Sequence, residues 1–101
     1  MSPEAVDPPD VEHVPDARRF EVHADGETAF LSYRRDGDRI ILIHTEVPES
    51  LRGRGIAGRL ARFALDYAKR EGLGVVPRCP FVKTYIQKHP EYLPLVPGSA
   101  R

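Results

Sequence analysis

The strongest local signal in this 101-residue chain is Leu51-Arg52-Gly53-Arg54-Gly55-Ile56-Ala57-Gly58-Arg59-Leu60. It follows a run of β-branched residues at 39–47. Beyond it the period of the pattern changes, because apolar residues fall at 56, 57, 60, 63, 64, 67 and 68. That spacing predicts a helix of about four turns with one buried face. The glycines therefore lie where a strand gives way to the start of a helix.

A loop of this kind is suited to binding a phosphate. The first amides of a helix have no partner within the helix, and the aligned peptide dipoles place about half a positive charge there. Gly53, Gly55 and the small Ala57 leave those amides open to a ligand, and three arginines in the segment add positive charge. We interpret the segment as a pyrophosphate cradle. The alternative is a tight turn followed by a glycine-softened helix start, although a glycine within a helix costs about 1 kcal/mol.

Two nucleotide-binding motifs compete for the same loop. A P-loop is excluded, because no Gly-Lys-Ser/Thr follows the glycines. Residues 53–58 match the dinucleotide pattern G-x-G-x-x-G letter for letter. However, residues 48–52 separate the preceding strand from the first glycine. Dinucleotide binding also requires an acidic residue at the end of the next strand, and this sequence has none there. We therefore take that match as a coincidence.

Turn signals divide the chain before this loop into three predicted strands. The first contains Phe20 and Val22 in alternation with polar residues, the second spans 28–35, and the third spans 39–47. Asp-Gly sequences follow the first two strands and are typical of hairpins, because glycine adopts positive φ at little cost. We therefore expect an antiparallel three-stranded meander.

The residues after the predicted helix complete the fold. Gly72 ends the helix as a left-handed cap, and 73–77 form a short apolar strand. A strand–helix–strand crossover is right-handed, so this strand is expected to lie parallel to 39–47. A last helix is expected from about Pro80 to His89, with four apolar residues buried: Phe81, Val82, Tyr85 and Ile86. The pattern predicts an α+β fold.

Composition bounds the organisation of the chain. Its length allows one domain, and its single cysteine allows no internal disulfide framework. Residues 1–16 are acidic and proline-rich and are predicted to be disordered, with a domain over 17–96 and a tail over 97–101. Residues 1–17 carry five acidic and no basic side chains, so the remaining residues carry a formal charge of +5. That charge suits an anionic ligand but is too small to indicate nucleic acid.

No apolar run approaches the length of a membrane span, and the first residues have neither the basic start nor the apolar stretch of a signal peptide. We expect a cytoplasmic protein without a membrane or nucleic-acid partner, as a monomer or a weak homodimer.

Several motifs together resemble one family. Arg52-x-x-Gly55-x-Ala57 is similar to the Arg/Gln-x-x-Gly-x-Gly/Ala signature of the GNAT acyltransferases. Val-Pro-Arg-Cys-Pro-Phe-Val at 76–82, Tyr85-Ile86 and His-Pro-Glu-Tyr at 89–92 resemble the minimal single-domain GNAT-like N-acetyltransferase family. The resemblance covers about residues 19–95. It implies a half-size GNAT fold: an antiparallel three-stranded meander, a crossover helix, a parallel fourth strand and a C-terminal helix.

The resemblance also implies a cofactor and its binding residues. In this superfamily the glycine loop binds the pyrophosphate of coenzyme A, and the preceding strand hydrogen-bonds the pantetheine arm. On this sequence, acetyl-CoA is expected at Thr45, Val47, Arg52, Gly53, Arg54, Gly55, Ile56, Ala57 and Gly58. The implied reaction is acetyl transfer to an amine of a small molecule or a protein. Larger members build much of the acceptor site from helices that this chain lacks, so the acceptor is not indicated.

Cys79 is a candidate catalytic residue because of its neighbours. Pro77 and Pro80 flank it, and proline favours the first helical position, so Cys79 is the predicted N-cap of the last helix. A thiol there faces the positive end of the helix with Arg78 and Lys83 nearby, conditions that favour the thiolate. The alternative is a small buried residue at a tight bend.

His44 and Glu46 are the candidate bases. They lie two apart on the strand 39–47, so we expect them on one face in line with Ile40 and Leu42. His44 can accept a proton from an amine or from Cys79. Glu46 lies nearer the loop, and larger GNAT enzymes often carry a catalytic glutamate on the equivalent strand. A structural role in the strand remains the alternative for both residues.

Two functions from different classes fit this pattern. One is an N-acetyltransferase that acts on an amine, and the other is a non-catalytic module that binds coenzyme A or acyl-CoA. We predict the enzyme, with direct transfer to the amine in preference to a route through acetyl-Cys79. No metal is expected, because the histidines show no metal-ligand spacing.

Overall fold

The computed structural model describes residues 11–98 and contains one five-stranded sheet in the order β1-β2-β3-β4-β5. The antiparallel strands are β1 (Glu12–Val14), β2 (Arg19–Ala24), β3 (Glu27–Asp36) and β4 (Arg39–Glu46). Strand β5 (Gly74–Pro77) runs parallel to β4, as the crossover rule predicts. The α+β prediction is confirmed, but the meander has four strands and not three.

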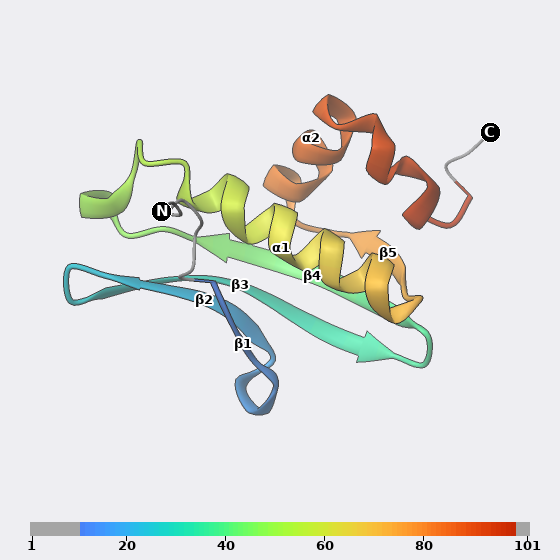
Figure 1. The fold of residues 1–101 in the computed structure, drawn as a ribbon, viewed down its shortest axis with the longest axis horizontal. Coiled ribbons are helices and arrows are strands. Elements are labelled where there is room, and N and C mark those ends of the chain that lie inside the picture. The colour runs from blue at the N-terminus through green and yellow to red at the C-terminus, as the bar shows by residue number, and fades with distance from the viewer. Residues whose placement is uncertain (1–10, 99–101) are drawn as a thin grey trace, which may run out of the picture.

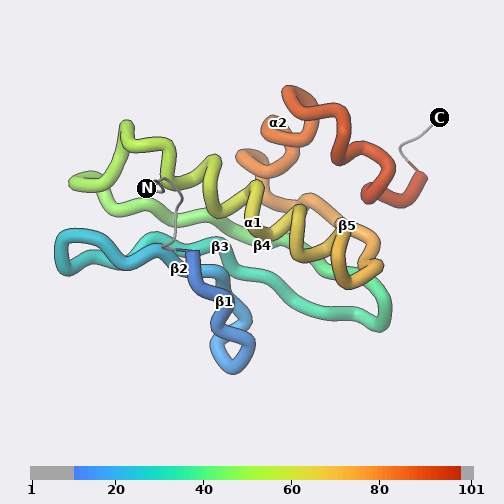
Figure 2. The backbone as a smooth tube through the Cα atoms, viewed as in Figure 1, coloured from blue at the N-terminus to red at the C-terminus, as the bar shows by residue number. Residues whose placement is uncertain are grey.

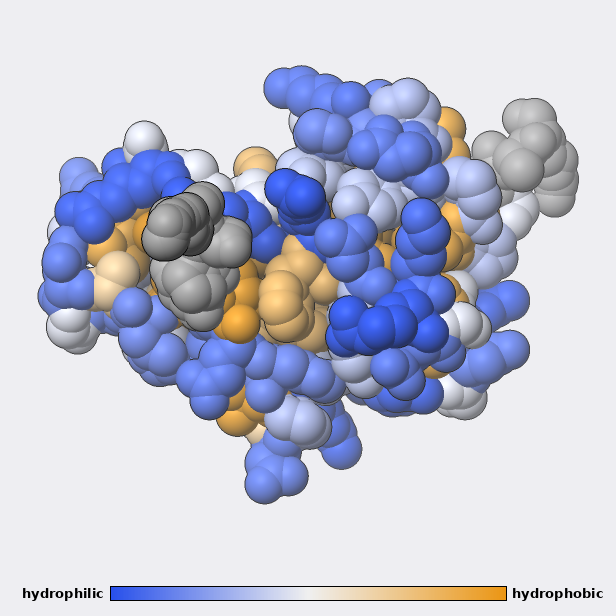
Figure 3. Space-filling view, viewed as in Figure 1, coloured by the Kyte–Doolittle hydropathy of each residue, from blue (hydrophilic) through white to orange (hydrophobic). Residues whose placement is uncertain are grey.

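Helix α1 (Ile56–Glu71) lies across one face of the sheet, and α2 (Pro80–Lys88) packs beside it near β5 (Figures 1 and 2). Residues 11–98 also include three short 3₁₀ helices: η2 (Pro15–Ala17), η3 (Glu49–Leu51) and η4 (Pro90–Leu95). The core lies between α1 and the sheet. Its fully buried side chains include Phe20, Leu31, Ile40, Leu42, Leu60 and Leu65. On the face shown in Figure 3, mostly hydrophilic residues cover this core, with apolar patches between them.

Strand β1 corrects one prediction. Residues 12–14 pair with β2, so the prediction that residues 1–16 are disordered is wrong for this stretch, while residues 1–10 lie outside the described part. His13 stacks on Phe20 and meets the edge of Tyr67, with ring centroids 4.6 Å apart in both cases. Its Nε2 lies 2.6 Å from the hydroxyl oxygen of Tyr33. These contacts come from distant parts of the chain and offset the entropy cost of ordering a polar segment.

Strand β4 contains a β-bulge that decides where its side chains point. Leu42 pairs with Tyr33 and His44 pairs with Ser32, so Ile43 has no partner on β3. An extra residue moves every later side chain to the opposite face of the sheet. Beyond the bulge, Thr45 is therefore on the helix face with Leu42, opposite the buried Leu31.

Both ends of α1 are capped by glycines with left-handed backbone. Gly55 precedes the helix with φ 75°, and Gly72 follows it with φ 69° and donates its amide to the carbonyls of Ala68 and Lys69. These conformations favour glycine, because a Cβ there meets the neighbouring carbonyl oxygen. The described helices include none that is long and apolar enough to cross a bilayer.

Candidate functional site

A pocket of about 190 Å³ opens where the end of β4, the glycine loop and the first turn of α1 meet. It contains most of the positions that the sequence predicted for cofactor binding. Its lining residues are Val47, Leu51, Arg52, Gly53, Gly55, Ile56, Ala57, Gly58 and Phe81. Thr45 and Arg54 were also predicted there but do not line it.

The backbone amides of residues 53–58 face no hydrogen-bond acceptor among the described residues. After Arg52, the next backbone amide with a partner is that of Arg59, which donates to the carbonyl of Gly55 at 3.1 Å. No side chain caps the helix, and its first turn contains no acidic residue, although a carboxylate is stabilised at that position. The start of α1 therefore keeps its positive potential available for an anion from outside the chain.

Gly58 lies within α1, where its backbone is not left-handed. A Cβ built on this residue would lie 3.8 Å from the Tyr85 ring, an ordinary contact distance. Folding alone would therefore accept alanine, which favours the helix by about 1 kcal/mol over glycine. Because Gly58 lines the pocket, its missing side chain gives a ligand close access to the helix backbone.

Two of the predicted arginines already have partners within the chain. The Nε of Arg52 donates to the carbonyl of Val47 at 3.1 Å, which fixes the loop to the end of β4. Arg54 forms an ion pair of 2.9 Å with Asp25 in the turn between β2 and β3. Both charges remain at the rim, because both arginines are exposed.

Strands β4 and β5 separate just beside this pocket. Their pairing ends at Leu42, whose carbonyl accepts the amides of both Arg78 and Cys79 at 2.9 Å. Among the described strands, none pairs with this edge of β4 beyond Leu42. The backbone of Thr45 and the amide of Val47 therefore have no partner strand on this edge and can hydrogen-bond an extended ligand, whereas the Val47 carbonyl already accepts from Arg52.

Cys79 is the N-cap of α2, as predicted, and its thiol is on the helix face of the sheet. The residue is only 3% exposed. Its Sγ lies 3.2 Å from Oγ1 of Thr45, which the bulge has turned toward it. The thiol is thus a buried hydrogen-bonding group at the point where the two strands separate.

His44 and Glu46 share a face with each other, but the prediction that they align with Ile40 and Leu42 is wrong. The bulge places them on the outer face, away from the helices, where they pair with Ser32 and Phe30. The Nε2 of His44 lies 2.9 Å from Oε1 of Glu46, and both side chains are more than half exposed. The sheet therefore separates this pair from Cys79.

Phe81 and Leu51 are pocket residues that the sequence did not predict. Phe81 was expected to be buried, but it is 40% exposed and forms part of the pocket wall. The buried stripe of α2 runs through Val82 and Ile86, four residues apart, and Phe81 lies beside that stripe. Leu51 is buried beneath the loop and lacks any motif that distinguishes it from other core leucines.

The 3₁₀ helix η4, which follows α2, is anchored to α1 by Tyr92. Its hydroxyl donates to Oδ1 of Asp66 at 2.7 Å. Burial, and then this hydrogen bond, raise the pKa of Tyr92 far above its ordinary value, so the hydroxyl stays protonated as a donor. This contact holds the last helices beside the pocket wall that Phe81 provides.

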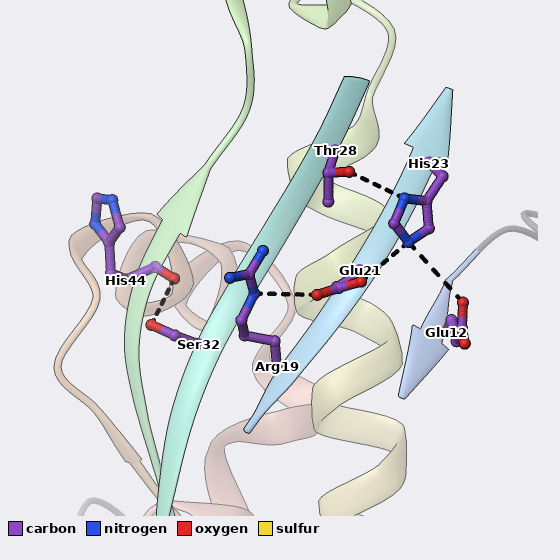
Figure 4. A network of polar contacts seen from close by, with 7 residues as sticks. All are labelled: Glu12, Arg19, Glu21, His23, Thr28, Ser32 and His44. Atoms are coloured by element: carbon purple, nitrogen blue, oxygen red, sulfur yellow. Dashed lines mark hydrogen bonds and ion pairs between the residues drawn. The ribbon is translucent and has the colours of Figure 1, made fainter. Parts of the chain in front are cut away.

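A second polar cluster lies on the outer face over β1, β2 and β3 (Figure 4). His23 contacts Glu21 through Nε2 and Thr28 through Nδ1, both at 3.0 Å, and Arg19 pairs with Glu21 at 3.2 Å. Its charged side chains pair with one another, although the buried Nε of Arg19 makes no hydrogen bond, and none of its residues lines the pocket beside the glycine loop. Residues 11–98 include no group of three or more His, Cys, Asp or Glu that could hold a metal ion.

Comparison with known proteins agrees with this geometry. Residues 19–95 match the family of GCN5-related N-acetyl-transferases. That range includes every strand from β2 to β5, the glycine loop and both α-helices. The chain belongs to the GCN5-related N-acetyltransferase (GNAT) family.

Named relatives of this GNAT chain are small proteins of similar length. It is 42% identical to mouse protein NATD1 over 79% of its own length and 76% of that protein. The human NATD1 protein is also 42% identical, with coverage of 79% and 74%. The NMR solution structure of a GCN5-like protein from Staphylococcus aureus superposes with a TM-score of 0.65 at 26% identity, covering 80% and 82% of the two chains.

The GNAT fold generally binds acetyl-CoA, and this chain has the features that such a ligand needs. Free amides and a helix start suit a diphosphate, and the open edge of β4 suits an extended amide-containing arm. Phe81 and Val47 provide apolar walls. The residues present therefore fit the cofactor of the family.

Proposed function

We propose that this protein is an N-acetyltransferase that takes an acetyl group from acetyl-CoA and transfers it to an amine. The proposal depends mainly on the free amides of residues 53–58 at the wall of a pocket beside the separated strands. A diphosphate there would gain hydrogen bonds from unpaired donors and a favourable helix dipole.

Each part of the helix-side site has a role in this proposal. The amides of residues 53–58 would hold the pyrophosphate, and the backbone edge of Thr45 and Val47 would pair with the pantetheine arm. Arg52 and Arg54 would add charge at the rim, while their partners Val47 and Asp25 keep them in place. Acetyl-CoA bound there would supply the acetyl group as a thioester, and the amine nitrogen would bond to the acyl carbon while coenzyme A leaves as its thiolate.

His44 is the proposed base for the amine proton. An ionised carboxylate only accepts hydrogen bonds, so the contact with Glu46 is donated by the Nε2–H of His44. This leaves the lone pair of Nδ1 free to accept the proton that the attacking amine loses. Glu46 then acts as a positioning residue, because it fixes the tautomer and orientation of the imidazole.

The separation of Cys79 from His44 supports direct transfer over a route through acetyl-Cys79. A nucleophilic thiol needs a base within hydrogen-bond reach. Within residues 11–98, the thiol of Cys79 has one side-chain hydrogen-bond partner, Thr45, whose hydroxyl is not a base at neutral pH. We therefore propose that Cys79 shapes the wall of the site and does not carry the acetyl group.

The test combines binding and turnover. Calorimetry would measure coenzyme A binding, while mass spectrometry would detect the acetylated product of an amine panel incubated with acetyl-CoA. The expected result is binding together with turnover that Cys79→Ala retains and His44→Ala loses. Binding without product from any amine would indicate the non-catalytic module, and absence of binding would contradict the proposal altogether.

A further inference from the structure

A second pocket, of about 140 Å³, lies on the outer face of the sheet. It is lined by Arg34 of β3, Ile41 and Ile43 of β4, and Arg78 after β5. Arg34 pairs with Ile41 across the two strands, which places the arginine beside the apolar floor. Ile43 is the bulged residue and is 42% exposed, an unusual position for a large aliphatic side chain on this face.

The two arginines are available for a ligand. Neither Arg34 nor Arg78 has an ion pair or side-chain hydrogen bond among the described residues, whereas neighbouring Arg35 donates to the carbonyl of Gly37 at 3.2 Å. The acidic side chain nearest along β4, Glu46, is already paired with His44. Two unpaired guanidinium groups around an aliphatic floor are complementary to an oxyanion that carries a short apolar group.

The position of this pocket relates it to the transfer reaction. Ile41 pairs with Val76 in the last stretch where β4 and β5 are joined, and Ile43 lies beyond that stretch. His44 follows Ile43 directly and shares the outer face. The pocket therefore borders the place where the strands separate, on the side of the sheet that carries the proposed base.

We propose that Arg34, Ile41, Ile43 and Arg78 bind the acetyl acceptor, and that the acceptor is a small aliphatic amine bearing an oxyanion group. The role of this ligand as an acetyl acceptor rests on the proposed acetyltransferase function. Binding of the ligand in the pocket does not. A cavity of about 150 Å³ accommodates a molecule the size of benzene. The pocket volume thus suits one short aliphatic group, with the oxyanion held between the two guanidinium groups.

The binding test uses isoleucine methyl groups as reporters. In protein labelled with ¹³C at the isoleucine δ1 methyls and saturated with coenzyme A, leucine is expected to shift Ile41 and Ile43. Leucinamide, which has the same side chain without the carboxylate, is expected to bind about tenfold more weakly, because it lacks a charge-assisted contact. Equal or tighter binding of leucinamide would overturn the proposal, as would shifts confined to Ile56 and Ile86.

Variants identify the residues responsible. Arg34→Gln and Arg78→Gln are each expected to weaken leucine binding about tenfold. Arg35→Gln is the matched control, because Arg35 is adjacent but its side chain is bound to Gly37. Unchanged binding in both pocket variants, or equal weakening in the control, would contradict the assignment.

A phosphate arm distinguishes the source of the oxyanion. O-phosphoethanolamine is compared with ethanolamine in the same binding measurement. Tighter binding of the phosphorylated amine supports the proposal in the same way as tighter binding of leucine than of leucinamide. Preference for the member without the oxyanion in both pairs would overturn it. If acetyl transfer favours amines without an oxyanion and ignores the arginine variants, the pocket assignment fails while the enzyme proposal stands. If amines that bear an oxyanion bind through the arginines without turnover, the enzyme proposal fails instead.

Discussion

The two faces of strand β4 differ in chemistry although they share one backbone. On the helix face, Thr45 contacts the buried Cys79, and the pocket at the end of β4 is bordered by the free backbone amides of the glycine loop. On the outer face, the exposed His44–Glu46 pair adjoins a pocket with two unpaired arginines. The helix face suits a ligand whose diphosphate is held by free backbone amides. The outer face suits proton transfer and recognition of a second, smaller anion.

The bulge at Ile43 produces this division. In a regular strand, His44 would share the face of Leu42 and lie near the thiol. With the extra residue, Thr45 takes that place and the imidazole points the other way. One inserted residue thus separates cofactor-side groups from base-side groups, and the two sides can meet only where β4 and β5 part beyond Leu42.

The largest expected effect comes from placing a charge in the glycine loop. Gly55→Asp puts a carboxylate beside the free amides, so coenzyme A affinity should fall by about 100-fold through repulsion and lost hydrogen bonds. Gly55 has φ 75°, a conformation that asparagine and aspartate tolerate better than other non-glycine residues. Gly55→Asn is therefore the control of matched shape. In calorimetry the coenzyme A affinity of Gly55→Asn should be at least tenfold higher than that of Gly55→Asp. Equal affinities in the two variants would argue against a bound anion.

The next effect concerns the outer face. His44→Gln should lower the turnover number about 100-fold, the usual contribution of a general base, while coenzyme A affinity changes less than twofold. His23→Gln is the control, because His23 is also an exposed histidine that contacts a glutamate on this face. Steady-state kinetics and calorimetry together check this. A parallel loss of affinity in His44→Gln would mean that the two faces are not separate.

A smaller effect distinguishes folding from binding on the helix face. Gly58→Ala should stabilise the fold by about 1 kcal/mol, because alanine favours the helix and the new methyl group meets only Tyr85 at an ordinary distance. The same methyl group narrows the pocket, so coenzyme A affinity should fall several-fold. Urea unfolding measures the first change and calorimetry the second. A loss of stability, or an unchanged affinity, would remove the functional reason given for this glycine.

The smallest effect lies far from both pockets, at His13. Desolvation by burial lowers the pKa of His13, with partial opposition from Glu71. The unfolded chain therefore takes up a proton more readily than the fold, so stability from this group is complete above about pH 6.5 and declines as the pH falls below it. Urea unfolding at pH 7 and pH 5 should show a smaller decline in His13→Gln than in the parent protein. Equal declines would show that His13 does not contribute.

The sequence predicted those features whose physics is local. The first amides of a helix have no partner within it, so the glycine-loop residues that line the helix-side pocket could be named in advance, whereas Leu51 and Phe81 could not. The N-cap position of Cys79 followed from Pro80 in the same way.

The features that depend on pairing between distant strands could not be predicted. The run Ile40-Ile41-Leu42-Ile43 is apolar throughout, so alternation gives no sign of the bulge, which exists only relative to β3. Similarly, β1 is polar and flanked by prolines, and its order comes from aromatic contacts with Phe20 and Tyr67. The outer pocket escaped notice because Arg34 and Arg78 are 44 positions apart and meet only in the folded sheet.

The separation of the two faces can be tested in one amide-detected NMR titration. Coenzyme A is added to ¹⁵N-labelled protein, and the amides of residues 53–58, which have no acceptor in the described chain, should shift most. Thr45 and Val47 should follow, while Arg34 and Ser32 on the outer face should move little. Unmoved loop amides in the presence of bound coenzyme A, or the largest shifts on the outer face, would contradict the account.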